Sequence, residues 1–256
     1  MAVELSFSGQ YAVLTLNRPE ALNALRFSML EEIARVADTI AASPARALIV
    51  TGAGPKAFCA GADIKELMGR DILAQRRGAE LGQNAFARLA ALSIPSVAVI
   101  HGYAFGGGLE LAMACTFRIA TPQAKMGLPE IKLGLIPGYG GTQRLPRLVG
   151  EARAKALVMS GRTIDAREAE HIGLVNEIVE GDDPVALGQA YLAQFTAFSK
   201  CASLFAREAV ERALATPLAE GLRIESDLST LAYQTHDANE GMRAFVEKRT
   251  PEFKDA

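Results

Sequence analysis

Two glutamates and a run of glycines are the residues in this chain whose types and spacing could carry out chemistry. Gly106–Gly108 is followed almost at once by Glu110, and a second carboxylate, Glu130, stands 20 residues further along. A strand-like apolar run at 96–100 leads into the glycines, and a helix-like run at 109–115 leads out. A strand that ends on glycines and restarts as a helix leaves backbone N–H groups without partners at the helix start. Such groups stabilise developing negative charge, and Glu110, one helical turn further on, is expected to lie beside them.

The elements that must position these groups follow one plan twice. Residues 47–66 and 97–115 both read as a strand, a glycine-rich turn and a helix. Strands that alternate with helices predict a parallel-type sheet covered by helices, in which ligands bind where strand ends meet helix starts. The turn of the first copy contains Gly61 and Ala62, and Asp63 after it is a typical N-cap residue. We therefore expect the two turns to face one site.

Other elements are expected from local patterns. Alternating residues at 3–17 predict a β-hairpin, and Ser28 with Glu31 forms a capping box that predicts a helix running to about Ala42. Residues 64–93 read as one polar helical segment. Beyond Gly150 the only strand-like run is 173–179, and the helical segments are 151–160, 165–171, 184–199, 201–215 and 217–247.

The composition is that of an ordinary globular protein. The 256 residues are 50% hydrophobic and 22% charged, with a net charge of −2, so nothing indicates the basic face that nucleic-acid binding needs. The N-terminus starts directly in a strand pattern and lacks the features of a signal peptide, and no apolar run approaches the ~18–20 residues that span a bilayer. The three cysteines are distant from one another and lack C-x-x-C spacing. We expect a cytoplasmic protein with reduced, structural cysteines, no membrane partner and no nucleic-acid partner.

Several familiar chemistries are excluded by missing motifs. The chain has no G-x-x-x-x-G-K-[ST] phosphate loop and no G-x-S-x-G nucleophile elbow. The second glycine-rich turn, 138–143, fails the G-x-G-x-x-G pattern at its last position. The histidines at 101, 171 and 236 are too scattered to indicate a metal site, and each is expected to be structural or at the surface.

Three stretches together resemble the enoyl-CoA hydratase/isomerase family, also called crotonases. They are 57–66 (AFCAGADIKE), 106–110 (GGGLE) and 129–143 (PEIKLGLIPGYGGTQ), and the likeness extends to 16–25 and 245–249. The resemblance implies an α/β fold, a crotonase-like spiral of strand–strand–helix units. It further implies a core at 1–195 that carries the active site and a helical region at 196–256 that trimerises and closes over coenzyme A. The expected assembly is a homotrimer or a dimer of trimers.

The same resemblance assigns roles to four residues. It implies an acyl-CoA thioester substrate, an oxyanion hole from the N–H groups of Ala62 and Gly107, proton exchange at C2 by Glu130, and activation of water by Glu110. Coenzyme A is then part of the substrate, and neither a metal nor another cofactor is expected. Adding H and OH across a double bond requires one group that gives a proton and another that takes one. The chain therefore most resembles an enoyl-CoA hydratase of fatty acid metabolism, a lyase.

Other interpretations stay open at this point. Members of the family with one carboxylate near position 130 are Δ3,Δ2-enoyl-CoA isomerases, and a specialised acyl-CoA dehydratase is a related alternative. A non-catalytic binding module on the same scaffold is a third. The glycines could serve only tight packing, and Glu110 could be an ordinary glutamate on a helix surface.

The resemblance also places residues along coenzyme A. These are Lys56, Ala60, Asp63, Ile64, Lys65, Phe245 and Lys248, although each lysine could instead be a solvated surface residue. Tyr139 stands where relatives more often carry a small residue, and we expect it to narrow the acyl pocket. The sequence leaves the length and branching of the acyl chain open.

Overall fold

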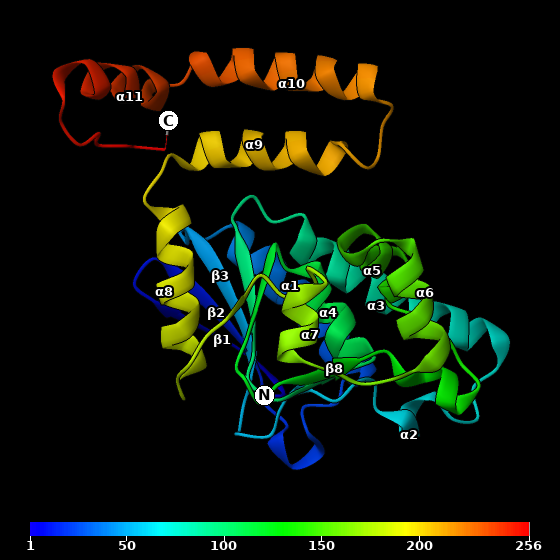
Figure 1. Ribbon diagram of the computed structural model, residues 1–256. Coiled ribbons are helices and arrows are strands. Elements are labelled where there is room, and N and C mark those ends of the chain that lie inside the picture. The colour runs from blue at the N-terminus through cyan, green and yellow to red at the C-terminus, as the bar shows by residue number, and fades with distance from the viewer. Residues whose placement is uncertain (256) are drawn as a thin grey trace. The chain divides into compact units, whose positions relative to one another are not determined.

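Two strands that are buried at every residue form the centre of the larger of two β-sheets. The structure, a computed structural model, describes residues 1–255 (Figure 1). β3 (Ala47–Gly52) and β5 (Ser96–Ile100) are parallel, and the six-stranded sheet has the order β1-β2-β3-β5-β7-β10. Its outer members are β1 (Val3–Ser8), β2 (Tyr11–Leu16), β7 (Phe117–Ala120) and β10 (Glu177–Ile178), and only the β1–β2 pair is antiparallel. Uninterrupted apolar strands are typical of a parallel sheet that is covered on both faces.

A second sheet accompanies the first, with the order β4-β6-β8-β9. Its strands are β4 (Ala57–Cys59), β6 (Tyr103–Phe105), β8 (Lys125–Gly127) and β9 (Ile164–Asp165). β4, β6 and β8 each follow a strand of the larger sheet and precede a helix, so the chain repeats a strand–strand–helix unit. The α/β spiral implied by the resemblance is thereby confirmed.

The sharp passage from one sheet to the other needs glycine. A Cβ atom on Gly52 would lie 2.2 Å from the carbonyl oxygen of Phe58, and one on Gly102 would lie 2.2 Å from that of Lys56. A side chain at either position would push the two sheets apart. The three-residue strands β4, β6 and β8 are too short to show the alternation that identifies a strand, which is why the sequence predicted turns or irregular chain there.

The helices of the first part of the chain have clear starts and stops. They are η1 (Pro19–Ala21), α1 (Phe27–Ala41), α2 (Ile64–Leu67), α3 (Ile72–Ala90), α4 (Gly107–Ala114), η2 (Pro129–Leu133), α5 (Gly141–Val149), α6 (Glu151–Ser160), α7 (Ala166–His171) and α8 (Pro184–Thr196). The expected 64–93 helix is in fact two, because Gly69 turns the chain with φ 71° and Asp71 caps α3 by accepting the Ala74 N–H at 2.7 Å. The expected cap at Ser28 is wrong. Helix α1 begins at Phe27, whose N–H is accepted by Glu66 Oε2 at 2.7 Å.

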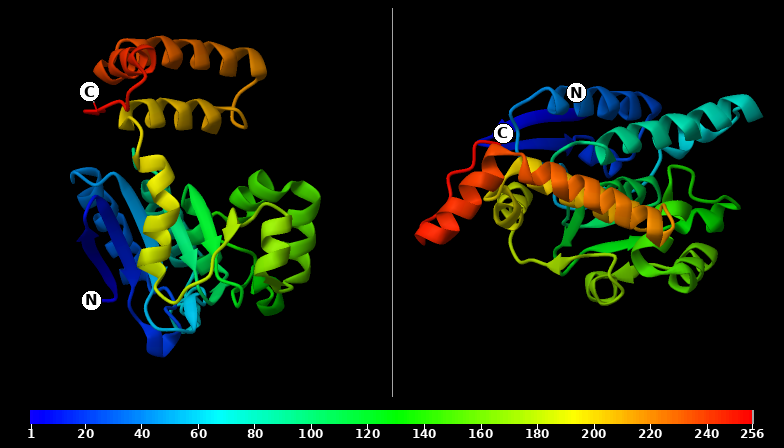
Figure 2. Two further views of the ribbon diagram at one scale, coloured as in Figure 1. Left: turned by 60° about the vertical axis from the view of Figure 1, so that its left-hand side comes forward. Right: turned by 90° about the horizontal axis from the view of Figure 1, so that it is seen from above.

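Two compact units make up the chain, Met1–Leu192 and Ala193–Ala256. The second contains α9 (Lys200–Arg212), α10 (Leu218–Tyr233) and α11 (His236–Glu247), with α9 and α10 side by side (Figure 2). The expected single segment at 217–247 is therefore two helices, and Thr235 caps the second by accepting the Ala238 N–H. Oligomerisation and closure over coenzyme A, the roles expected for 196–256, stay predictions.

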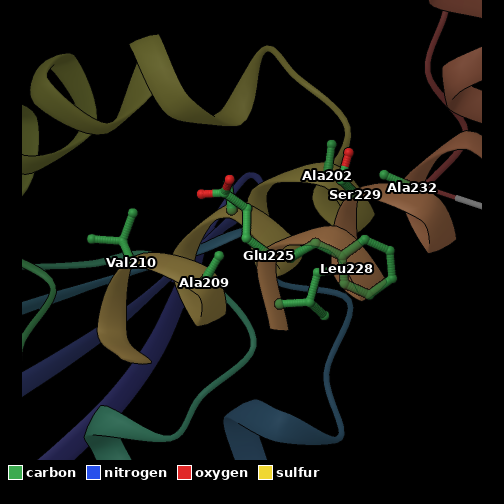
Figure 3. A pocket seen from close by; sticks show the side chains of 9 residues that line it. Ala202, Ala209, Val210, Glu225, Leu228, Ser229 and Ala232 are labelled. Carbon is green, nitrogen blue, oxygen red and sulfur yellow. The ribbon is translucent and has the colours of Figure 1, made fainter. Parts of the chain in front are cut away.

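An open pocket of about 370 Å³ lies between α9 and α10 of the second unit (Figure 3). Its lining is mainly alanine with Phe205, Val210 and Leu228, and Glu225 is its one charged residue. This lining offers no pair of carboxylates. Within residues 1–255, no helix is long and apolar enough to cross a membrane, and all three cysteines are free thiols.

Candidate active site

The start of α4 presents the N–H of Gly107. Gly107 is the first residue of the helix, so its N–H has no acceptor within the helix. Gly106 before it adopts φ 49° and ψ −125°, a conformation that suits only glycine. A Cβ on Gly108 would lie 2.2 Å from the carbonyl oxygen of Cys59, so this glycine allows α4 to begin directly against β4. Tight packing thus accounts for Gly108, whereas Gly107 keeps a donor available.

The N–H of Ala62 is available as well, and the chain beside it is held firmly. Leu25 donates its N–H to Gly61 O at 2.8 Å and accepts the Asp63 N–H at 2.8 Å, which leaves Ala62 N–H without an acceptor among residues 1–255. A Cβ on Gly61 would lie 3.2 Å from Phe105 O and 3.9 Å from Gly106 Cα. The two glycine-rich turns are therefore neighbours, as expected from the repeated plan.

Glu110 is held inside the protein by the second glycine-rich loop. Its residue is 1% exposed, so it is not a surface glutamate. Its Oε1 accepts the N–H of Tyr139 at 2.8 Å and that of Gly141 at 2.7 Å. Burial raises the pKa of Glu110 to about 7, the charge of Glu130 adds to that rise, and the two N–H groups oppose it.

Glu130 lies in η2, near the start of α4, and its environment differs from that of Glu110. A Cβ on Gly106 would lie 2.8 Å from Glu130 Oε1, which places this carboxylate against the turn that precedes Gly107. Its Oε2 is buried and has no hydrogen-bond partner among residues 1–255. Burial raises the pKa of Glu130 above its ordinary value.

Tyr139 fills the space between α3 and α4. The residue is 7% exposed, and its ring lies so close to Gly82 that a Cβ there would come within 2.2 Å of it. A Cβ on Gly107 would lie 3.1 Å from the same ring, and the Phe86 ring meets it edge-on at 5.8 Å. Burial raises the pKa of Tyr139 to about 12, so its phenol stays neutral. Tyr139 thus forms a wall beside the Gly107 donor.

The residues expected along coenzyme A differ in exposure and in their contacts. Lys56, Ile64 and Lys65 are exposed and Ala60 is half-buried. The side chain of Asp63 caps α2 by accepting the Lys65 N–H at 3.3 Å and pairs with Arg18 at 3.3 Å and Arg26 at 3.5 Å. Although burial opposes it, the hydrogen bond from Arg18 holds the pKa of Asp63 below its usual range. The Asp63 side chain therefore has a structural function in this fold, beyond any contact with a ligand.

Phe245 and Lys248 belong to the second unit. Phe245, on α11, is 86% exposed, and Lys248 ends the helix in a left-handed conformation with φ 55°. Their contact with coenzyme A stays a prediction.

Sequence reasoning missed two residues that hold the loop around Tyr139. Gln83 Nε2 donates to Gly138 O at 2.9 Å, and Arg144 Nη1 donates to Tyr139 O at 3.0 Å. Gln83 lies on α3, far from the loop in the sequence, and no spacing pattern could have identified it. Arg144 closely follows the glycine-rich turn, but a single arginine on a helix is usually read as a surface charge. Within residues 1–255, no group of three His, Cys, Asp or Glu side chains could hold a metal ion.

The spiral of strand–strand–helix units is the fold of the crotonase class of α/β proteins, and in this chain it brings two unpartnered N–H groups close to the buried Glu110 and the half-buried Glu130. Residues 7–256 match the family model described as enoyl-CoA hydratase/isomerase. The chain is 46% identical over 242 residues to a probable enoyl-CoA hydratase of Mycobacterium leprae, which covers 94% of this chain and 93% of that protein. It is 41% identical over 243 residues to a crotonyl-CoA hydratase of Syntrophomonas wolfei, with 94% of each chain covered.

Solved structures agree with the sequence relatives. The crystal structure of an enoyl-CoA hydratase from Bacillus anthracis superimposes with a TM-score of 0.91 at 38% identity and covers 100% of both chains. A structure from Geobacillus kaustophilus gives a TM-score of 0.94 at 34% identity, covering 100% of this chain and 99% of that one. The chain belongs to the enoyl-CoA hydratase/isomerase family.

Proposed function

We propose that this protein is an enoyl-CoA hydratase, which adds water across the 2,3 double bond of a 2-trans-enoyl-CoA to give a 3-hydroxyacyl-CoA. The observation that carries the proposal is the pair of carboxylates, the buried Glu110 and the half-buried Glu130, close to the α4 start that carries the free Gly107 N–H. Relatives over most of the chain length are named as hydratases, among them the crotonyl-CoA hydratase of S. wolfei.

The oxyanion hole would consist of the N–H groups of Ala62 and Gly107. Attack of water at C3 moves electrons from the double bond onto the thioester oxygen, which becomes an enolate oxygen. Two N–H groups that point at this oxygen and need no rearrangement stabilise the enolate, and loss of one such donor typically costs roughly 10²–10³-fold in rate.

The two glutamates would handle the two protons of the reaction. The water oxygen bonds to C3 while Glu110 takes a proton from that water. Glu130 then gives a proton to C2 as the enolate collapses. The product carries OH on C3 and a new hydrogen on C2, while Glu110 holds the water proton and Glu130 is ionised. Transfer of that proton back through solvent restores the starting state.

The starting state needs one proton on the pair, and the surroundings favour this. Burial raises the pKa of both groups, and their like charges disfavour double ionisation. Two N–H groups of the 139–141 loop donate to Glu110 and oppose the effect of burial on its ionised form, whereas at Glu130 its own backbone N–H opposes burial. Glu130, with a buried oxygen that has no donor, is the better place for the proton.

The remaining predictions extend this proposal. Coenzyme A would run past Lys56, Ala60 and the α2 start at 63–65, and Phe245 and Lys248 would close over it in a homotrimer or a dimer of trimers. Exposed apolar side chains on the second unit, such as Val246 at 80%, support burial against another copy. Light scattering that gives a mass near one chain, 27.2 kDa, would contradict the assembly. The proposed reaction needs no metal or redox cofactor, so dialysis against a chelator should leave the rate unchanged.

The decisive experiment follows loss of the conjugated-enoyl absorbance of crotonyl-CoA. The wild-type protein should hydrate it, and a Glu110→Gln variant should lose the activity by several orders of magnitude. Retention of most activity in that variant would favour a one-carboxylate isomerase, which a 3-enoyl-CoA substrate would then reveal. Absence of change with every enoyl-CoA, including longer and branched ones, would favour a binding module.

A further inference from the structure

The loop that holds Glu110, Pro137–Gly141, makes hydrogen bonds at three of its four peptide groups. In the Gly138–Tyr139 peptide, Gly138 O accepts a hydrogen bond from Gln83 Nε2 and the Tyr139 N–H donates one to Glu110 Oε1. Tyr139 O accepts a hydrogen bond from Arg144 Nη1, and the Gly141 N–H donates one to Glu110 Oε1. The orientation of Glu110 therefore depends on a loop whose shape is maintained by two side chains from outside it.

Of the two side chains, Arg144 contributes more than Gln83 to holding the Pro137–Gly141 loop. Its guanidinium lies over Gly140, which has φ 112°, and a Cβ at Gly140 would come within 2.2 Å of Arg144 Nη1. Arg144 also accounts for the one side-chain hydrogen bond to Tyr139 O, at 3.0 Å, so its removal would leave that carbonyl oxygen without its donor. The positively charged group thus occupies a place that only a glycine-containing loop could offer.

Arg144 also acts electrostatically on Glu110. Burial and the charge of Glu130 raise the pKa of Glu110, and the charge of Arg144 lowers it together with the two N–H groups. The nearby Tyr139 phenol and Cys59 thiol each have a pKa raised by burial to about 12 and stay neutral. The groups that act on Tyr139 itself are Glu110, Arg70, Glu66 and Cys59.

We propose that Arg144 is a positioning residue, which locks the Pro137–Gly141 loop so that two N–H groups hold Glu110 as an aimed, ionised carboxylate. Its role in hydration rests on the proposed function, whereas its hold on Glu110 can be measured without any reaction. Arg147, three residues further along α5, gives a matched control because it is exposed and, among residues 1–255, its side chain bonds to Gln143 O and not to the Pro137–Gly141 loop.

The first test measures the titration of Glu110 directly. Protein labelled with glutamate carrying ¹³C at the carboxyl carbon is titrated by NMR, and Glu110→Gln assigns the signal. Arg144→Met should raise the Glu110 midpoint by roughly 0.5–1 pH unit, because a nearby cation and a firmly held pair of donors are both lost. Arg144→Lys should retain most of the wild-type midpoint, and Arg147→Met should retain all of it.

The second test separates positioning from binding. With crotonyl-CoA, Arg144→Met should lower kcat about tenfold at pH values above the midpoint while KM stays within about twofold, as expected for loss of transition-state alignment. Gln83→Leu, which removes a loop hydrogen bond without changing charge, should lower kcat by less and leave the midpoint in place.

The outcomes are distinguishable. The proposal is overturned if Arg144→Met matches Arg147→Met in both midpoint and kcat. If circular dichroism shows that Arg144→Met does not fold, the Arg144→Lys variant is used instead. Arg144→Lys should keep the Glu110 titration midpoint and have a lower kcat than the wild type. An unchanged kcat in Arg144→Lys would overturn the proposal. A wild-type protein that hydrates no enoyl-CoA but shows the midpoint shift would refute the proposed function and leave the role of Arg144 in holding Glu110 intact.

Discussion

Glu110 and Glu130 both lie near the start of α4, yet their surroundings differ. Glu110 is fully enclosed on α4 and its Oε1 receives two backbone N–H groups, at 2.7 and 2.8 Å. Glu130 is half-buried in a short 3₁₀ helix, and its Oε2 is buried without a donor. Burial raises the pKa of both groups, and at Glu110 two N–H groups of a neighbouring loop oppose that rise. Two identical side chains thus have different surroundings, which is the basis for the opposite roles proposed for them.

Removal of each carboxyl group tests the comparison most strongly. Glu110→Gln and Glu130→Gln should each lower kcat/KM for crotonyl-CoA by about 10³-fold, in the range expected when a positioned acid or base is lost. In deuterated water, Glu110→Gln should still exchange the C2 hydrogen of a saturated acyl-CoA, whereas Glu130→Gln should not. Loss of exchange in Glu110→Gln and its retention in Glu130→Gln would reverse the assigned roles.

The stability of the protein should reveal the cost of ionising Glu110. Because its folded pKa lies near 7 and its ordinary value near 4.5, the folded state binds more protons than the unfolded state between these pH values. The cost to stability of ionising Glu110 is absent at low pH, grows between about pH 4.5 and pH 7, and levels off above pH 7 at about 3 kcal/mol. Glu110→Gln should therefore raise the free energy of unfolding in urea at pH 8 and change it little at pH 4.5.

Protein concentration must be equal in those unfolding experiments, since assembly would shift apparent stability. An equal effect of the substitution at both pH values would show that ionisation of Glu110 carries no such cost.

Two glycines allow each carboxylate to be disturbed separately. A Cβ on Gly106 would lie 2.8 Å from Glu130 Oε1, and one on Gly141 would lie 3.0 Å from Glu110 Cγ and Oε1. We expect Gly106→Ala and Gly141→Ala to lower kcat by roughly 30-fold, because displacement of a catalytic group by about 1 Å can cost up to 10²-fold. When kcat is plotted against pH, only Gly141→Ala should shift the acidic limb, which reports the ionisation of Glu110. Shifts of equal size in both variants would mean that the two carboxylates are not held independently.

Substitution of Tyr139, the wall beside Gly107, should have the smallest effect on the rate of hydration and should change which acyl chains are accepted. Tyr139→Ala removes a ring that fills the space between Gly82 and Gly107, so the ratio of kcat/KM for longer acyl chains to that for crotonyl-CoA should rise about tenfold. Tyr139→Phe keeps the ring and provides the control. A panel of enoyl-CoA substrates measures the ratio, and an unchanged chain-length profile in Tyr139→Ala would contradict the prediction.

Much of the site could be recognised in the sequence because its parts are local. The resemblance to the enoyl-CoA hydratase/isomerase family and the α/β spiral are both confirmed. A strand, a glycine turn and a helix within 20 residues predict free N–H groups at the turn, and the family resemblance then assigned these groups to Ala62 and Gly107. Asp63 was likewise a correct N-cap, because capping depends on residues two or three positions away.

Other features depended on residues that only folding brings together. The start of α1 at Phe27 is supported by Glu66, 39 positions away, which is why the local capping box at Ser28 misled. The strands of the smaller sheet are three residues or fewer, too short to form a pattern of their own, and exist because neighbouring strands pair with them.

The sequence by itself identified the family by resemblance, and with it the two carboxylates and the two N–H donors to which roles are proposed, since all of them lie in short stretches of the chain. The tertiary structure alone decided which carboxylate receives donors. That difference comes from a loop 29–31 residues beyond Glu110, held by Gln83 on α3 and by Arg144 on α5. Burial and hydrogen bonds set a pKa through the three-dimensional surroundings of the group, and no spacing in the chain records them.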